Sequence, residues 1–299
     1  MYFDKEHNKR KTLREAMEKG PVFAPCVFNP CTALIVEHAG FDAMCLSGGN
    51  FSASLSGISD IGLMTPTEIK NMVSNITKVA SIPMIVDMDT GYGNELNAIR
   101  TAVDFAEAGA MALHFEDQVF PKRCGHLNGK RVIPREDYFK KIRAVSDALK
   151  GSDCLLIART DSYLQYGVEE AIARNIGALE NGADIAFTEG ARTIKDIERI
   201  GHEVQGWNMF DMLHGGASPD VSFEDLIQMG YRLVTSPKSL HYIYTSFSDI
   251  AARARKECSD AFVGATGLKL GRDYDDYLSR KEWLNLGKGY NPDVFHEAE

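Results

Sequence analysis

Residues 107–116 read EAGAMALHFE, and two later stretches follow the same plan: ENGADIAFTE at 180–189 and QMGYRLVTSP at 228–237. In each stretch, a segment with helical periodicity ends at a glycine and a short apolar run follows. Glycine often ends a helix because it adopts a left-handed backbone conformation without a steric penalty. A short apolar run without alternation is typical of a strand buried on both faces, as in a parallel sheet. The three stretches therefore predict helices that alternate with parallel strands.

Eight apolar runs of this kind occur along the chain, with helix-like segments between them. They lie at 21–29, 43–49, 83–89, 110–117, 154–161, 183–190, 206–210 and 231–237. Eight strands alternating with helices predict an α/β fold, a (β/α)8 TIM barrel, with an open doubly wound sheet as the rival. Because such barrels often exceed 200 residues as one unit, we predict a single domain over 1–299. Its barrel covers about 20–240, and a mostly helical C-terminal extension covers about 241–299.

The composition excludes several classes of protein. The 299 residues carry a net charge of −9, which disfavours binding to nucleic acid or to an anionic membrane surface. The N-terminus has no apolar signal segment, and no apolar run reaches the ~18 residues of a membrane span, so we expect a cytoplasmic protein. The six cysteines have no Cys-x-x-Cys spacing, which favours free thiols in a reducing compartment.

Polar side chains gather where the apolar runs end, which is where barrels carry their chemistry. Asp87, Asp89 and Glu116 form a group of carboxylates, and the first two are spaced to point to one side of a strand. Oxygen ligands without a nearby Cys or His pair favour a hard cation, Mg²⁺ or Mn²⁺. Arg159 offers a two-pronged donor for a carboxylate or an enolate oxygen. The backbone N–H groups of residues 47–49, Ser-Gly-Gly, suit an anionic carboxylate.

Residues 121–126 read PKRCGH and place a thiol among cationic neighbours. Cys124 follows Lys122 and Arg123 and precedes His126 by two positions. Free cysteine has a pKa of ~8.5, and nearby positive charge lowers it, so we expect much of Cys124 to be thiolate at neutral pH. Two nearby glycines favour a mobile loop. The alternative is a basic surface loop with an incidental cysteine.

In combination, the motifs SGG, DMDTGYGN, HFEDQVFPKRCGH, ARTD, TEG and WN resemble the isocitrate lyase and phosphoenolpyruvate mutase superfamily over roughly residues 20–240. KRCGH resembles the carbon–carbon lyase branch of that superfamily. The resemblance implies a (β/α)8 barrel and dependence on Mg²⁺. It also implies a homotetramer whose C-terminal helices are exchanged between subunits.

The resemblance also implies roles for individual residues. The implied metal ligands, direct for the first and through water for the others, are Asp87, Asp60, Asp89 and Glu116. The residues implied to contact substrate are Ser47, Gly48, Gly49, Gly125, Arg159 and Asn208. The implied catalytic residues are Cys124, as the acid/base on a closing loop, with Lys122, Arg123, His126 and Glu189 beside it.

The resemblance implies that the enzyme cleaves a small dicarboxylate or tricarboxylate, with Cys124 protonating the carbanion that leaves. In methylisocitrate and isocitrate lyases, hydroxyls after the asparagine hold a distal carboxylate, whereas this chain has Phe210 there. Thr188 also departs from the proline expected in methylisocitrate lyases. These departures imply an apolar distal pocket, which favours a smaller dicarboxylate, 2,3-dimethylmalate, giving pyruvate and propionate.

Three alternatives stay open. The first is an oxaloacetate hydrolase, which produces oxalate and acetate, and the second is a 2-methylisocitrate lyase, which produces pyruvate and succinate. The third is a barrel that binds a dicarboxylate and Mg²⁺ without turnover, as a sensor or scaffold.

Overall fold

The computed structural model describes residues 11–265, 278–292 and 294. The described residues up to Leu240 form one compact unit, and those from His241 onward belong to a second. The first unit holds every strand and every residue discussed as part of the site.

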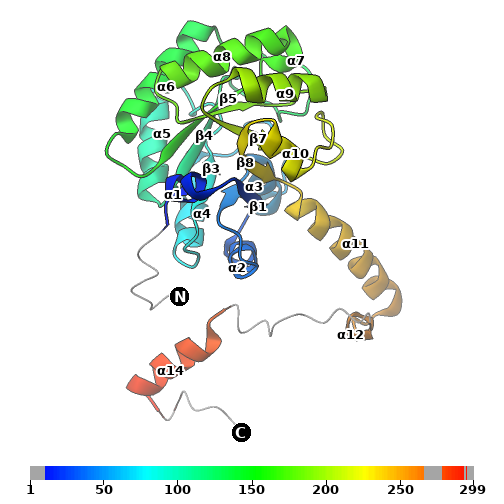
Figure 1. Cartoon of the computed structure of the whole chain (residues 1–299). Coiled ribbons are helices and arrows are strands. Elements are labelled where there is room, and N and C mark those ends of the chain that lie inside the picture. The colour runs from blue at the N-terminus through cyan, green and yellow to red at the C-terminus, as the bar shows by residue number, and fades with distance from the viewer. Residues whose placement is uncertain (1–10, 266–277, 293, 295–299) are drawn as a thin grey trace. The chain divides into compact units, whose positions relative to one another are not determined.

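Eight parallel strands form the first unit's closed barrel (Figure 1). They are β1 Val22–Val27, β2 Met44–Leu46, β3 Met84–Asp87, β4 Ala112–Glu116, β5 Leu155–Thr160, β6 Ile185–Thr188, β7 Trp207–Asp211 and β8 Tyr231–Ser236. Each strand pairs with the next in the chain, and β8 returns to pair with β1, with Val22 opposite Leu233. This closure confirms the predicted (β/α)8 barrel, because an open sheet would leave β1 and β8 as unpaired edges.

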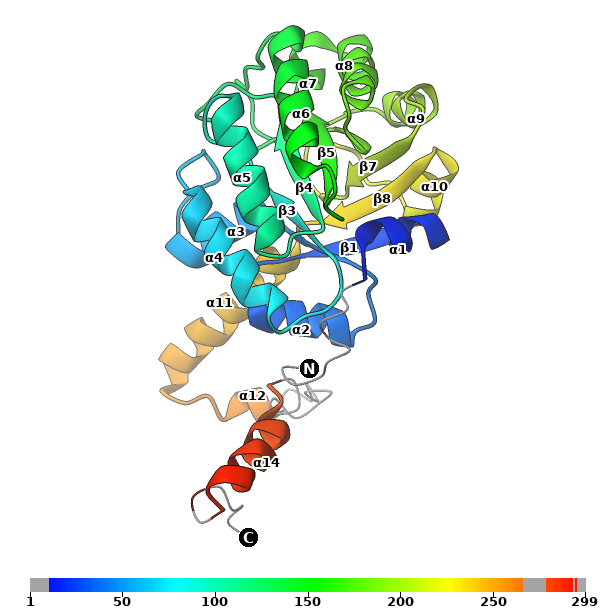
Figure 2. The same cartoon turned by 90° about the vertical axis from the view of Figure 1, so that its left-hand side faces the viewer.

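Apart from α1, which precedes β1, the helices of this unit follow the strands and cover the outside of the barrel (Figures 1 and 2). They are α1 Leu13–Lys19, α2 Pro30–His38, α3 Gly48–Ser56, α4 Pro66–Thr77, α5 Glu95–Glu107, α6 Arg135–Leu149, α7 Tyr163–Tyr166, α8 Val168–Glu180, α9 Ile194–Glu203 and α10 Phe223–Gln228. The three glycines of the repeated plan, Gly109, Gly182 and Gly230, follow α5, α8 and α10 with positive φ. Gly230 is also tightly packed, since a Cβ there would lie 2.6 Å from the carbonyl oxygen of Gly201.

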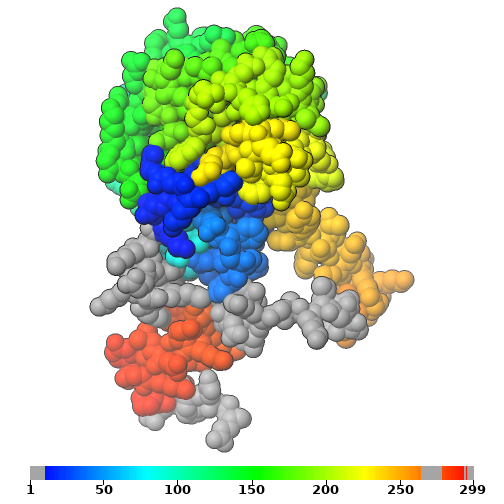
Figure 3. Space-filling model, viewed as in Figure 1, coloured from blue at the N-terminus to red at the C-terminus, as the bar shows by residue number. Residues whose placement is uncertain are grey.

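Side chains alternate along each strand between the barrel interior and the helix layer. Ile85, Ile157, Ile185, Met209 and Leu233 share the interior cluster, which α1 joins through two buried apolar side chains. In the space-filling view, the blue residues of α1 lie against yellow residues of β8 and its neighbours (Figure 3). The alternation decides which polar side chains at the strand ends turn inward.

The second unit contains α11 Ser239–Glu257 from His241 onward, together with the C-terminal helices α12 Phe262–Ala265 and α14 Arg280–Tyr290. Three aromatic side chains of α11 are largely exposed: Tyr242, Tyr244 and Phe247. Within this unit, the guanidinium of Arg253 lies over the ring of Phe262, 4.2 Å from its centroid. None of the described helices combines the length and the apolar character required to cross a membrane.

Candidate active site

A buried group of carboxylates surrounds Lys122 at the end of β3. The ammonium of Lys122, which is 2% exposed, lies 2.9 Å from Asp89 Oδ1 and also contacts Asp60 Oδ1. Asp87 lies beside this pair and accepts hydrogen bonds from the backbone N–H groups of Gly48 (3.2 Å) and Asp89 (3.0 Å). Gly48 has no room for a side chain, because a Cβ would lie 2.9 Å from Asp87 Oδ2. The structure therefore brings the Ser-Gly-Gly segment and the predicted metal-binding acids together.

The acids of this group differ in their pKa. Burial works to raise the pKa of Asp87, but the charges of His114, Lys122 and Arg159 outweigh it and hold this pKa well below its usual range. Burial raises the pKa of Glu116 well above its usual value, despite the nearby cations of Arg159 and Lys122. Neither carboxylate oxygen of Glu116 accepts a hydrogen bond, and Arg159 Nε lies 3.4 Å away. Buried oxygens without a donor are ones that a hard cation satisfies, so the carboxylate group fits Mg²⁺ or Mn²⁺.

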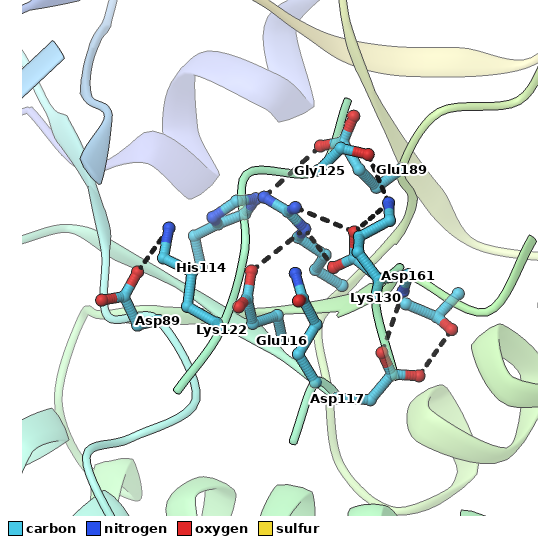
Figure 4. A network of polar contacts seen from close by, with 12 residues as sticks. Asp89, His114, Glu116, Asp117, Lys122, Gly125, Lys130, Asp161 and Glu189 are labelled. Atoms are coloured by element: carbon cyan, nitrogen blue, oxygen red, sulfur yellow. Dashed lines mark hydrogen bonds and ion pairs between the residues drawn. The ribbon is translucent and has the colours of Figure 1, made fainter. Parts of the chain in front are cut away.

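A second network surrounds Arg159, which is 6% exposed at the end of β5 (Figure 4). Asp161 accepts two hydrogen bonds from the Arg159 guanidinium, from Nε at 2.8 Å and from Nη2 at 3.0 Å. Glu189 lies 3.4 Å from Nη1. Asp161 is fixed in turn by Asp117, which accepts its backbone N–H at 2.9 Å. Arg159 is thus oriented by three carboxylates, Glu116 among them.

The loop that carries Cys124 lies over these two groups. The backbone N–H of Cys124 donates to the carbonyl oxygen of Asp60 at 3.0 Å. Gly125 packs so closely against Arg159 and Glu189 that a Cβ would overlap both. In this structure the loop is closed over the arginine.

The expected activation of the Cys124 thiol is wrong for this structure. Burial, followed by the charge of Asp60, raises the pKa of Cys124 to about 11. The two preceding cations do not lower it: the Lys122 ammonium is neutralised by carboxylates, and Arg123 is exposed, with its guanidinium 3.4 Å from the carbonyl oxygen of Asn128. Cys124 is therefore a protonated thiol at neutral pH. Adjacency in sequence did not reveal where the cationic side chains point.

His126 takes part as a neutral ring of defined tautomer. Its Nδ1 accepts the backbone N–H of Ala217 at 2.9 Å, and its Nε2 lies 3.2 Å from Glu189 Oε1. Burial lowers the pKa of His126, so the ring is neutral at pH 7. Since Nδ1 is the acceptor, the proton sits on Nε2, which lies near Glu189 without forming a hydrogen bond to it.

Asp211 is an interior residue that the sequence did not single out. Its carboxylate, Glu189 and His126 offer ligand atoms within 4.8 Å of one another. The tautomer of His126 argues against a cation there, because its Nε2 carries a proton rather than a free lone pair. Thr235 Oγ1 donates to Asp211 at 2.5 Å. Strand alternation was the available signal, since Asp211 lies two residues after the interior Met209 on β7.

Asn208 and Phe210 lie on the opposite face of β7. The Asn208 amide donates to the carbonyl oxygen of Val204 at 2.8 Å, and Phe210 packs edge-on against Tyr231 in the cluster between β7 and the helices. The structure does not bring Asn208 together with the site group, and its substrate contact stays a prediction. Phe210 does not line the site, so the apolar distal pocket inferred from it is wrong.

A closed barrel with carboxylates, an arginine and a thiol loop gathered at one end has the layout of a TIM-barrel enzyme. The family model described as phosphoenolpyruvate phosphomutase matches residues 13–255, and the chain belongs to this family. The predicted membership in the isocitrate lyase and phosphoenolpyruvate mutase superfamily is confirmed.

The chain is similar to several lyases of this superfamily. It is 40% identical to 2-methylisocitrate lyase of Aeropyrum pernix, covering 75% of this chain and 72% of that one. It is 35% identical to 2,3-dimethylmalate lyase of Eubacterium barkeri, covering 80% and 83%. A crystal structure of 2,3-dimethylmalate lyase matches with a TM-score of 0.88 at 29% identity, covering 96% and 97%. Oxaloacetate acetylhydrolase with 3,3-difluorooxalacetate also matches with a TM-score of 0.88, at 27% identity, covering 95% and 97%.

Proposed function

We propose that this enzyme is a metal-dependent carbon–carbon lyase that cleaves a 2-alkylmalate, with 2,3-dimethylmalate giving pyruvate and propionate. The observation that carries the proposal is the protonated thiol of Cys124 on a loop closed over Arg159. Breaking a carbon–carbon bond beside a carboxylate leaves a carbanion that needs a proton, and a buried thiol is a suitable donor.

The chain's own residues divide the work. Cys124 supplies the proton, and its closed loop keeps bulk water from the carbanion. Arg159 binds a substrate carboxylate, and the N–H groups of residues 47–49 hold the oxo-acid end. Mg²⁺ or Mn²⁺, held by Asp87 with Asp60, Asp89 and Glu116, would stabilise negative charge on substrate oxygens.

The acids of the interior favour a dicarboxylate over a tricarboxylate. Glu189 and Asp211 lie together on the barrel side of β6 and β7, next to the neutral His126. A third substrate carboxylate near them would add negative charge beside Glu189 and make it still harder to ionise Asp211, whose pKa is already raised by burial and by Glu189. These interior acids, rather than Phe210, therefore favour dimethylmalate over methylisocitrate.

The second candidate is an oxaloacetate hydrolase. Its support is the match to oxaloacetate acetylhydrolase, which equals the match to 2,3-dimethylmalate lyase in TM-score. Oxaloacetate is also a dicarboxylate, so the interior acids do not discriminate against it. The two candidates differ in product, because the hydrolase route yields oxalate.

We further propose a homotetramer in which C-terminal helices pack on neighbouring subunits. The aromatic side chains of α11 named above are exposed, with Tyr242 at 68% and Phe247 at 65%, and a partner subunit would bury them. The free thiols of all six cysteines fit the proposed cytoplasmic location.

A substrate panel tests the proposed activity. The purified protein, with Mg²⁺ or Mn²⁺ added, is incubated with 2,3-dimethylmalate, 2-methylisocitrate or oxaloacetate, and products are identified by mass spectrometry. We expect pyruvate and propionate from dimethylmalate, and none of either from Cys124→Ala. Oxalate from oxaloacetate with no pyruvate from either alkylmalate would establish the hydrolase instead. If the protein bound one of these compounds but turned over none of the three, the alternative of a sensor or scaffold would remain.

A further inference from the structure

Lys130 is a buried cation to which the proposed chemistry gives no task. It lies where the thiol loop returns to the barrel, close to the isolated bridge between Gln118 and Val132 that closes the base of the loop. Only 8% of Lys130 is exposed, although lysine is almost never buried without a charged partner. Its ammonium has two partners, the carbonyl oxygen of Gly125 and Asp161 Oδ1, the latter at 2.7 Å.

These two partners belong to different parts of the site (Figure 4). Gly125 is the loop residue between Cys124 and His126, so its carbonyl fixes the peptide next to the thiol. Asp161 lies after β5 and accepts hydrogen bonds from the guanidinium of Arg159. Its Oδ1 is shared between Lys130 Nζ and Arg159 Nη2. One ammonium therefore connects the thiol loop to the arginine.

Two other cations contact the loop away from the thiol peptide: Lys122 pairs with Asp60 and Asp89, and Arg192 Nη2 donates to Asn128 Oδ1 at 3.4 Å. The contacts nearest Cys124 involve uncharged donors. Gln118 exchanges two hydrogen bonds with the backbone of Arg123, at 2.8 and 3.0 Å. The Cys124 and Ala217 N–H groups supply one bond each, to Asp60 and to His126. Hydrogen bonds from a charged donor are roughly twice as strong as neutral ones. Within the described loop, Lys130 is the cation that joins the peptide beside Cys124 to the barrel.

We propose that Lys130 is a positioning residue that holds the Cys124 loop closed by tying it to Asp161 and hence to Arg159. Because Asp161 serves both cations, the closed loop and the oriented guanidinium stabilise each other. The inference rests on the proposed function only in taking Cys124 as the reacting group. The test uses neither substrate nor metal, so the inference about Lys130 can fail while the proposed activity stands. Equally, the proposed activity can fail while the inference about Lys130 stands.

The test compares the alkylation rate of Cys124 by iodoacetamide in wild-type protein and Lys130→Met, with peptide-resolved mass spectrometry and without divalent cations. The exposed Cys31 is the internal reference in the same digest. We expect the ratio of the Cys124 rate to the Cys31 rate to rise about tenfold or more, which corresponds to about 1.4 kcal/mol in loop opening. Lys140→Met, which removes an exposed lysine of α6, should leave the ratio unchanged.

Two further variants separate positioning from general packing. Lys130→Arg keeps a buried donor cation and should retain most of the protection of Cys124. Lys130→Gln keeps a donor without the charge and should give an intermediate ratio, and it replaces Lys130→Met if that variant does not fold. A Cys124 ratio that stays at the wild-type value in a folded Lys130→Met or Lys130→Gln protein would overturn the proposal. So would Lys130→Arg behaving like Lys130→Met.

Discussion

The pKa of Cys124 decides whether this thiol gives or takes a proton. Burial and the charge of Asp60 raise the pKa to about 11, at least two units above the ~8.5 of a free thiol. A hydrogen bond from the backbone of His126 and the charge of Arg159 offset only part of the rise. Two pKa units correspond to roughly a hundredfold lower thiolate fraction at neutral pH. Because only the thiolate attacks iodoacetamide, Cys124 should react roughly a hundredfold more slowly than an unperturbed thiol of equal access.

The assay follows alkylation of Cys124 against pH in protein stripped of divalent cations. The rate should keep rising through the alkaline range towards a midpoint of about 11, whereas a small free thiol added as reference levels off near its ordinary ~8.5. Asp60→Asn removes the second cause of the shift, so it should move the midpoint of Cys124 to lower pH. A wild-type midpoint at or below ~8.5, the free-thiol value, would refute this reasoning. It would instead restore the activated thiolate that the flanking cations suggested.

Three further predictions follow from the same geometry. Gly125→Ala places a methyl group on Arg159 and Glu189, so the loop should not close, and activity should be lost with little change in melting temperature. Arg174→Met leaves the fully buried Asp117 without the cation 3.0 Å away, and the free energy of unfolding in urea should fall by about 3–5 kcal/mol. Burial and the charge of Glu189 raise the folded-state pKa of Asp211 to about 7. As pH rises from about 4 to about 7, wild-type protein should therefore lose up to about 1.4 kcal/mol of stability per pH unit relative to Asp211→Asn.

Each of these three predictions has a control variant or an outcome that would contradict it. Gly151 has open space around it, although its φ of +83° makes any side chain strained there. Gly151→Ala should therefore lower stability but leave activity unchanged, whereas Gly125→Ala should abolish activity with little change in stability. Lys140→Met breaks an exposed pair with Asp137 and should cost ~1 kcal/mol or less. For Asp211, the sign is fixed because the folded state binds the proton more tightly than the unfolded state. If the stability of the wild-type protein rose with pH relative to Asp211→Asn, the raised pKa of Asp211 would be contradicted.

Much of the architecture follows from local patterns. Continuous apolar runs predicted the parallel strands, and the glycines at 109, 182 and 230 predicted where three helices end. Both follow from short-range physics: burial of both strand faces, and the freedom of glycine at positive φ. The carboxylates and Arg159 were predicted to lie near one another, because a parallel barrel brings the carboxyl ends of its strands to one rim.

The sequence by itself therefore predicted the barrel, with an open sheet as the rival, the family, and the rim that gathers the carboxylates and Arg159. It did not determine which neighbours a side chain meets across the barrel. Lys122 precedes Cys124 by two residues but is neutralised by Asp60 and Asp89, and burial sets the thiol pKa. Alternation on β7 turned Asp211 inward and Phe210 outward, and Lys130 reached Asp161 across 31 positions. Burial and long-range charge depend on the folded chain as a whole, so only the tertiary structure decides them.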